Sequence, residues 1–368
     1  MKRIPFCCIF IFYVSISILW GGPNKKYELW TTPGYFRGFN IGYWSNHGDR
    51  PRKIEDLKAI RALGANLLKL NLYEGFRRNT PPYDEITDNM RDLKLLIEMC
   101  RKTGLYYVID VRGGPGRRDV SDEVFRDSIW KDKAVRKKYA EMLQKIVRLY
   151  GKDPLFAGLN IMIEPNPLWE YIEKEKIETP EELEKEMERQ KIDLHGLFAY
   201  FIKEIRLVDK MLPCIVQCVS YSSPEWWGLM KKQPDPYVVY DVHSYVPYEF
   251  THARFSNSRE YPGEYWNMAL NRDVVYDKKI LKTVILDPVR KFQQKYRVPV
   301  ILGEFGLRRP QNGGIKFLSD YVDIAVEYGW HFALWEFRPN DPDTKKHIEF
   351  DPEKWAEGYW KEVLSWFG

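Results

Sequence analysis

Short apolar runs alternate with longer charged segments along most of the chain, and this alternation limits the fold more than any other feature. Eight runs have the length and composition of strands, and a segment of helical length follows each of them. They span residues 36–41, 66–72, 105–111, 157–163, 213–219, 237–242, 298–303 and 330–335. Runs that are apolar almost throughout, such as 298–303, indicate strands buried on both faces. The pattern predicts an α/β fold, a single-domain (β/α)8 TIM barrel.

The predicted helices fit between these strands, at 52–63, 90–103, 133–150, 180–210, 278–296 and 315–328, and a last amphipathic run covers 352–367. The alternative is a doubly wound open sheet, which would place a glycine-rich phosphate turn after the first strand. The residues there, Phe39-Asn40-Ile41-Gly42, offer no such turn. A longer segment, 247–272, follows the sixth strand. Because barrel active sites lie at the carboxyl ends of strands, we expect this segment to overhang the site.

The amino-terminal segment has the composition of a secretory leader. Lys2 and Arg3 precede a stretch that is apolar from Phe6 to Trp20 apart from two serines, and a pair of glycines follows. We predict a signal peptide over residues 1–22 and one folded domain over 23–368, secreted and without a membrane partner once the leader is removed. A retained leader would instead anchor the protein at the cell envelope, since the stretch is only slightly shorter than a membrane-spanning helix.

Composition excludes several classes of function. The 57 Lys and Arg residues nearly balance the 52 Asp and Glu residues. Their scatter argues against nucleic-acid binding, where basic side chains gather on one face. The cysteines after the leader show no paired spacing and there is no histidine cluster, so neither a metal nor an organic cofactor is implied. Aromatic residues make up 15% of the chain; such rings line carbohydrate clefts and also fill ordinary cores, so this number decides nothing alone.

Two glutamates close apolar strands. Glu164 ends the fourth strand in NIMIEPN (160–166), and Glu304 ends the seventh in VILGE (300–304). A lone buried charge is costly, so each carboxylate needs a partner or a task. A partner arginine at the barrel rim would explain one such glutamate as well as catalysis does. Two in equivalent positions favour catalysis, because a pair of carboxylates is the arrangement that hydrolyses glycosidic bonds.

These and other motifs resemble glycoside hydrolase family 5, a set of retaining (β/α)8-barrel enzymes that act on β-linked polysaccharides. The similarity extends from RGFN (37–40) in the first strand to Trp335 in the eighth. It implies that Glu164, followed by proline, is the acid/base and that Glu304, in Gly-Glu-Phe-Gly, is the nucleophile. Trp335 matches the family's aromatic platform under the sugar at the cleavage site.

The resemblance also implies a set of substrate contacts. His243 and Tyr245 match the pair on the sixth strand that contacts substrate and nucleophile, and we expect further contacts from Asn40 and Asn166. Tryptophans in predicted loops are expected to include stacking platforms for sugar rings. These are Trp44, Trp169, Trp226, Trp227 and Trp266.

Three positions depart from the family pattern. Ile163 stands where the family has the asparagine before the acid/base, Arg112 replaces the third-strand histidine, and Lys69 replaces the second-strand arginine that orients the nucleophile. Isoleucine cannot supply the hydrogen bond to the sugar, so Asn160 or Asn166 would have to replace it. Lys69 is expected to steady the nucleophile as a point charge, without bidentate geometry, and Arg112 to shape the same subsite.

The sequence therefore predicts a cellulase-like retaining glycoside hydrolase that cleaves β-linked polysaccharide or oligosaccharide through a covalent glycosyl-enzyme. The resemblance implies β-1,4-glucan as first substrate and mannan as second. The alternative is a carbohydrate-binding barrel in which Ile163, Arg112 and Lys69 weaken or abolish hydrolysis. We expect a secreted monomer whose partner is the carbohydrate, with no nucleic-acid partner.

Overall fold

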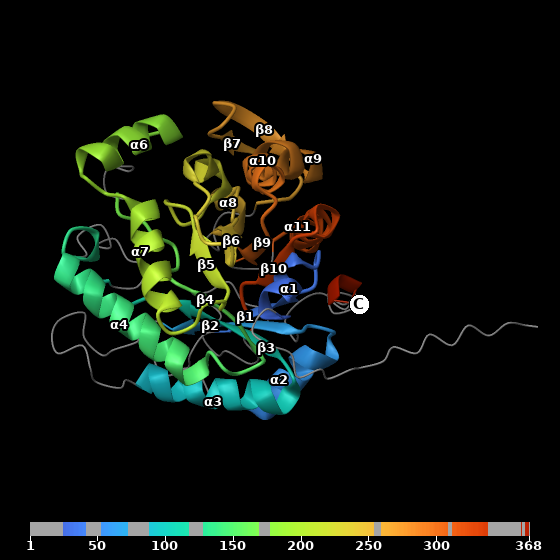
Figure 1. The fold of residues 1–368 in the computed structure, drawn as a ribbon. Coiled ribbons are helices and arrows are strands. Elements are labelled where there is room, and N and C mark those ends of the chain that lie inside the picture. Colours follow the sequence, from blue (N-terminus) through green and yellow to red (C-terminus); the bar gives the residue numbers. More distant parts are fainter. Residues whose placement is uncertain are drawn as a thin grey trace, which may run out of the picture.

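The chain folds into a closed barrel of eight parallel strands surrounded by helices (Figure 1). The computed structural model describes residues 25–41, 53–72, 88–117, 128–168, 177–253, 259–307, 311–337, 362 and 365–367. The barrel strands are β1 (Arg37–Ile41), β2 (Leu67–Leu72), β3 (Tyr106–Val111), β4 (Phe156–Asn160), β5 (Cys214–Gln217), β6 (Val238–His243), β9 (Val300–Glu304) and β10 (His331–Leu334). Each overlaps one of the predicted runs, so the predicted fold class is confirmed.

Helices cover the outside of the barrel (Figure 1). The longer ones are α2 (Ile54–Ala62), α3 (Asp88–Thr103), α4 (Lys133–Tyr150), α6 (Pro180–Arg189), α7 (Leu194–Arg206), α10 (Asp287–Tyr296) and α11 (Gly314–Tyr328). The shorter ones are α1 (Lys25–Thr31), η2 (Ser128–Trp130), η3 (Pro224–Leu229), α8 (Tyr248–Thr251), α9 (Lys278–Ile280) and the π-helical turn η4 (Leu281–Ile285). None of the described helices combines the length and apolar character that crossing a bilayer requires. The predicted leader, residues 1–22, lies outside the described residues.

Three long segments differ from their predictions. The single helix predicted over 180–210 is divided into α6 and α7, because Lys191 has a left-handed φ of 57° and Asp193 caps a new helix. The helix predicted over 278–296 likewise restarts at Asp287, before a proline that lacks a backbone donor. The segment 247–272 contains α8 and strand β7 (Gly263–Asn267), which pairs antiparallel with β8 (Arg272–Tyr276). The predicted run 352–367 lies outside the described residues except for 362 and 365–367.

The barrel interior changes from apolar to polar along its axis. Near the amino ends of the strands, the inward side chains pack with Trp30 and Phe36 in one apolar cluster, formed by Leu67, Val108, Ala157, Ile215, Val239, Ile301 and Ala333. Two residues further along five of these strands stand Lys69, Asp110, Gln217, Asp241 and Gly303. Because side chains alternate along a strand, these positions also point inward and form a second, polar layer. This layer lies directly below the carboxyl ends of the strands.

Helix α1 closes the amino end of the barrel. The ring Nε1 of Trp30 donates to the carbonyl of Ala157 at 2.9 Å. His331, at the start of β10, accepts the backbone N–H of Phe36 on Nδ1 at 3.0 Å and donates from Nε2 to the carbonyl of Trp30 at 2.8 Å. Burial lowers the pKa of His331 to about 4, so this ring is neutral.

Candidate active site

Glu164 and Glu304 meet at the carboxyl end of the barrel. Glu304 is the last residue of β9, and Glu164 follows β4 with a left-handed φ of 46°. Both are buried: 8% of the surface of Glu164 and 3% of that of Glu304 is exposed. One carboxylate oxygen of each and a ring nitrogen of His243 lie within 4.8 Å of one another. The two carboxylates that close separate strands are therefore brought into one site.

Arg112, which follows β3, lies between the two carboxylates. Its Nη2 donates to Oε1 of Glu304, and its Nη1 is 3.7 Å from Oε2 of Glu164. Its Nε donates to Oδ1 of Asn71 at 2.7 Å. The guanidinium also stacks on Trp335, with Cζ 4.7 Å from a ring centroid. The ring that the resemblance assigns to a sugar thus has a guanidinium over one face in this structure.

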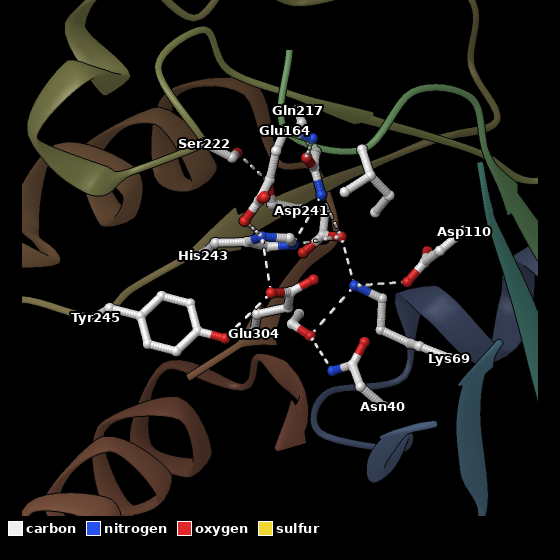
Figure 2. A network of polar contacts seen from close by, with 12 residues as sticks. Asn40, Lys69, Asp110, Glu164, Gln217, Ser222, Asp241, His243, Tyr245 and Glu304 are labelled. Carbon is white, nitrogen blue, oxygen red and sulfur yellow. Dashed lines mark hydrogen bonds and ion pairs between the residues drawn. The ribbon is translucent and has the colours of Figure 1, made fainter. Parts of the chain in front are cut away.

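His243 and Tyr245 contact the two carboxylates. The hydroxyl of Tyr245 donates to Oε2 of Glu304 at 3.1 Å. Nδ1 of His243 lies 2.8 Å from Oε1 of Glu164 and 3.6 Å from Oε2 of Glu304 (Figure 2). His243, at the end of β6, therefore lies near both glutamates, and Tyr245, two residues later, donates to Glu304.

Lys69 lies one layer deeper than expected. Its Nζ is 2.8 Å from Oδ2 of Asp241 and 3.3 Å from Oδ2 of Asp110, and it donates to the carbonyl of Gly303 at 3.2 Å. The side chain has no exposed surface. Its charge still acts through space to lower the pKa of Glu304, as expected of a point charge, but its burial leaves no surface for a contact with substrate. Lys69 contacts β9 at the carbonyl of Gly303, the residue before Glu304. The guanidinium that contacts the Glu304 carboxylate belongs to Arg112, which follows β3.

Asn40 has a similar supporting position. It is fully buried and donates to the carbonyl of Gly303 at 2.7 Å, so the expectation of a substrate contact is wrong here too. Gly303 has to be glycine for these contacts, because a Cβ would lie 1.9 Å from a carboxylate oxygen of Asp241 and 2.5 Å from Nζ of Lys69. Asn40 and Lys69 thus hold the backbone that presents Glu304.

The asparagines proposed as replacements for the missing donor differ. Asn160 is fully buried and donates to Oδ2 of Asp241 at 2.9 Å, which removes it from contact with substrate. Asn166 is 1% exposed, and its side-chain oxygen has no hydrogen-bond partner in the described part of the chain. Ile163 is fully buried. The side-chain oxygen of Asn160 also has no partner among the described residues, but its amide nitrogen is bound to Asp241 in the polar layer, whereas Asn166 follows Glu164 in the chain.

The tryptophans expected in loops also differ in their surroundings. Trp44 and Trp169 lie outside the described residues. Trp227 packs edge-on against Phe292 in the core, so this ring is one of the loop tryptophans that serve packing. Trp266 is 52% exposed on the β7–β8 hairpin.

A cavity of about 370 Å³ adjoins Glu164, and Trp335 is not among its lining residues. Aromatic side chains dominate its wall, including Tyr221, Trp226 and Tyr248. Tyr248 belongs to the segment 247–272, which confirms that this segment reaches the site. The volume is within the range of small-molecule sites.

The two glutamates differ in acidity. Burial raises the pKa of Glu304 to about 7, with His243 and Arg112 opposing the rise. Burial acts upward on Glu164 as well, but the hydrogen bond and charge of His243 bring its pKa below the usual value. Burial lowers the pKa of His243, and Glu304 and Asp241 raise it more, to about 10. In this structure the pKa of Glu304 therefore lies above that of Glu164. A protonated acid at Glu164 and an ionised nucleophile at Glu304 require the opposite order.

Sequence reasoning missed Gln217 and Asp241. Both are fully buried beneath the glutamates, and Nε2 of Gln217 donates to Oδ2 of Asp241 at 2.8 Å. Burial acts to raise the pKa of Asp241, but Lys69 and His243 lower it to about 2. A polar residue at an inward position of an otherwise apolar strand was the signal that would have identified them.

Glu164, His243 and Glu304 are also the described residues whose ligand atoms lie close enough together to hold a metal ion. Arg112 already places a positive charge against both carboxylates. The guanidinium of Arg112 therefore already supplies the positive charge between the two carboxylates. This charge explains how two acids are buried side by side.

Comparisons with known proteins agree with this geometry. A family model described as Cellulase (glycosyl hydrolase family 5) matches residues 27–341. Endoglucanase C of Acetivibrio thermocellus is 22% identical over 342 residues, which cover 83% of this chain and 91% of that protein. Cellodextrinase A of Ruminococcus flavefaciens is 22% identical over 286 residues, which cover 74% and 76%.

Solved structures share the fold. Cel5A of Thermotoga maritima in complex with mannotriose superposes with a TM-score of 0.66 at 20% identity, over 93% of this chain and 100% of that one. The Clostridioides difficile cellulose synthase subunit Z superposes with a TM-score of 0.64 at 16% identity, over 90% and 99%. The resemblance drawn from the motifs is confirmed by the match of the family model. The chain belongs to the cellulase family, glycosyl hydrolase family 5, and is an O-glycosyl hydrolase.

Proposed function

We propose that this protein is a retaining β-glycoside hydrolase in which Glu304 is the nucleophile and Glu164 the acid/base. The observation that supports this most strongly is the short separation of the two carboxylates, whose nearest ligand oxygens lie within 4.8 Å. Retaining enzymes hold their carboxyl groups about 5–5.5 Å apart, whereas inverting enzymes need about 6.5–9.5 Å to admit a water molecule. The spacing favours retention.

The reaction proceeds in two displacements. The Glu304 carboxylate attacks the anomeric carbon and forms an ester bond, while the glycosidic C–O bond breaks and the leaving oxygen takes the proton of Glu164. Water then attacks the same carbon and gives its proton to the Glu164 carboxylate, and the ester bond to Glu304 breaks. Both glutamates are restored, and the configuration of the sugar is retained.

The neighbours of Glu304 suit a nucleophile. Arg112 and Tyr245 each donate to one of its oxygens. Hydrogen bonds to a carboxylate stabilise its charged form, so they oppose the effect of burial. These donors keep the carboxylate available for attack.

We infer a β-1,4-glucan as the substrate, with mannan next. The names of the relatives, an endoglucanase and a cellodextrinase, and the mannotriose complex of a structural neighbour support this order. The aromatic cavity beside Glu164 is where the leaving sugar would stack, since Glu164 must protonate the oxygen of that sugar.

We further propose a secreted monomer with a removable leader over 1–22 and one catalytic domain over 23–368. Its Asn166 would supply the hydrogen bond that Ile163 cannot.

A panel of β-glycans and aryl β-glycosides tests the activity directly. We expect the mature protein to hydrolyse at least one member, and Glu304→Ala to reduce the rate to background. The same background rate for both proteins on every member would reject hydrolysis and favour the carbohydrate-binding alternative.

A mechanism-based fluoroglycoside tests the roles. It should label Glu304 covalently, and mass spectrometry of the digested protein identifies the labelled residue. Labelling of Glu164 instead would reverse the two assignments.

A further inference from the structure

The side chain of Gln217 joins three parts of the site. Gln217 is the last residue of β5 and is fully buried. Its amide contacts the backbone of Glu164, the carboxylate of Asp241 and the ring of His243 (Figure 2). One amide thus connects the predicted acid/base to the histidine beside it.

The direction of this amide is fixed by Glu164. A backbone N–H can only donate, so the atom of Gln217 that receives the N–H of Glu164 must be Oε1. The opposite end is then the NH2 group. Its two hydrogens have acceptors at 2.8 Å, Oδ2 of Asp241 and Nε2 of His243.

Nε2 of His243 therefore has to present a lone pair. In a neutral imidazole the other nitrogen then carries the proton, and Nδ1 is 2.8 Å from Oε1 of Glu164. We propose that Gln217 is a positioning residue that keeps Nε2 of His243 unprotonated, so that His243 meets Glu164 as a neutral hydrogen-bond donor.

Charges around the ring act in the opposite direction. Glu304 and Asp241 favour the imidazolium, and Oδ2 of Asp241 is 3.4 Å from Nε2. However, a proton on Nε2 would point at the NH2 group of Gln217, only 2.8 Å away. The amide can turn away only by leaving the backbone N–H of Glu164 without its acceptor, and a buried unpaired donor is costly.

The other cations of the site reduce the pull of these carboxylates. Nζ of Lys69 is 2.8 Å from Oδ2 of Asp241, and Arg112 donates to Glu304. Asp241 and Glu304 therefore already have a positive partner, and Arg112 also lies 3.7 Å from Glu164, the third acid next to His243. This leaves the hydrogen-bond geometry to decide the state of the ring.

The consequence for catalysis rests on the proposed function. An imidazolium would hold the pKa of Glu164 low through its charge, and an acid/base has to take up a proton. A neutral ring leaves only the hydrogen bond. Gln217 would thus allow Glu164 to take up a proton and to act as the acid.

Side-chain ¹⁵N NMR of the whole protein, labelled at histidine, measures which ring nitrogen carries the proton. At pH 7 we expect His243 protonated on Nδ1 alone. His331 is an internal reference with the opposite tautomer, because its Nδ1 accepts from Phe36. His243→Asn assigns the signal. An imidazolium, or a proton on Nε2 alone, in the wild type at pH 7 would overturn the proposal.

Two variants of Gln217 separate this role from a structural one. Gln217→Glu replaces the NH2 group with an oxygen of nearly the same shape that can only accept, so we expect His243 to be doubly protonated at pH 7. Gln217→Met removes both hydrogens, so we expect a proton to be found on Nε2, which then faces Asp241. An unchanged His331 signal shows that each variant is folded. A wild-type tautomer of His243 in either folded variant would contradict the proposal.

The pH profile of hydrolysis gives a second readout. In Gln217→Glu the imidazolium should keep Glu164 ionised, so kcat/KM at pH 7 should fall by roughly tenfold or more and the optimum should move to lower pH. If the wild type hydrolyses nothing, the proposed function fails, but the tautomer measured by NMR still stands or falls separately.

Discussion

Two buried histidines stand at opposite ends of the barrel and differ in everything except depth. His331 is 1% exposed and His243 is 2% exposed. His331 bonds only to backbone groups, and burial lowers its pKa to about 4. His243 lies among carboxylates that act to raise its pKa against the same effect of burial, while the amide of Gln217 lies 2.8 Å from its Nε2. Depth alone does not decide the state of a buried ring; the charge of its neighbours and the direction of its hydrogen bonds do.

The comparison extends to the two ends as a whole. The amino end is filled by apolar side chains and closed by α1, so its polar groups are there to satisfy backbone. The carboxyl end buries several acids, among them Asp110, Glu164, Asp241 and Glu304, together with Lys69 and Arg112. We therefore expect substitutions at the amino end to change stability alone, and substitutions at the carboxyl end to change activity and its pH dependence as well.

Removing the guanidinium of Arg112 should have the largest effect on the contrast between the two ends of the barrel. In Arg112→Met, Glu164 and Glu304 lose the cation between them, and removal of one partner of a buried ion pair costs about 3–5 kcal/mol. The folded-state pKa values of the two acids then rise above their unfolded values. The free energy of unfolding should thus fall by that amount at pH 7 and recover as the pH falls toward about 5.

Urea unfolding at both pH values measures this effect. Arg112→Lys is the matched control, because it keeps the charge without the planar fork and should lose less stability. An equal loss at both pH values in Arg112→Met would mean that the guanidinium contributes packing on Trp335 and not charge.

Acid titration of His331 should have the next largest effect. The pKa of the folded state is about 4 against an ordinary value of 6.5, so the unfolded chain binds the proton first as the pH falls. The contribution is therefore complete above pH 6.5 and is lost between pH 6.5 and 4, by about 3 kcal/mol. His331→Gln cannot titrate. Its free energy of unfolding should lie below that of the wild type at pH 7.5, and the gap should narrow by about that amount at pH 4.

Activity distinguishes this effect from one at the site. His331→Gln should keep the wild-type kcat/KM at pH 7 on whichever panel substrate is cleaved. A constant stability gap across the pH range would show that the folded His331 takes up its proton at an ordinary pKa.

The smallest expected effect comes from a single hydroxyl. Tyr245→Phe removes one donor from the Glu304 carboxylate, and a hydrogen bond to a charged group is worth about 1.5–3 kcal/mol. We expect kcat/KM to fall by roughly tenfold to a hundredfold. Tyr321→Phe is the control, because its hydroxyl is also buried but bonds to Ser244 and to the carbonyl of Val246. It should lower stability and leave kcat/KM unchanged; equal losses of activity would remove the special role of Tyr245.

The same two layers show what the sequence could predict. The barrel followed from apolar runs whose bounds differ by a few residues from the strands, because a strand buried on both faces leaves a continuous signal. Glu164 and Glu304 were found because a charge at the end of such a run is unusual. Lys69 was placed one layer too high, because sequence spacing gives the face of a strand but not the height of a long side chain in the barrel.

Other parts of the site depend on the register between neighbouring strands, which the sequence does not give. Gln217 and Asp241 lie 24 residues apart in sequence but are paired in register across β5 and β6, which places the Gln217 amide against His243, two residues after Asp241. The β7–β8 hairpin was missed since its exposed residues alternate with buried ones too briefly to stand out from a loop. The division between α6 and α7 depends on one left-handed residue, Lys191, which no periodicity reports.

With Trp335 as the proposed sugar platform, the stacking of Arg112 on it would make the arginine side chain an internal competitor for the sugar. A ring that occupies the same face of Trp335 has to displace a group that is covalently tethered to the site and so is present at high effective concentration. The affinity measured for any ligand is then a difference between two occupants. Ligands that reach only Trp335 should bind weakly, and those that also engage the cavity beside Glu164 should gain more than their added contacts alone would provide.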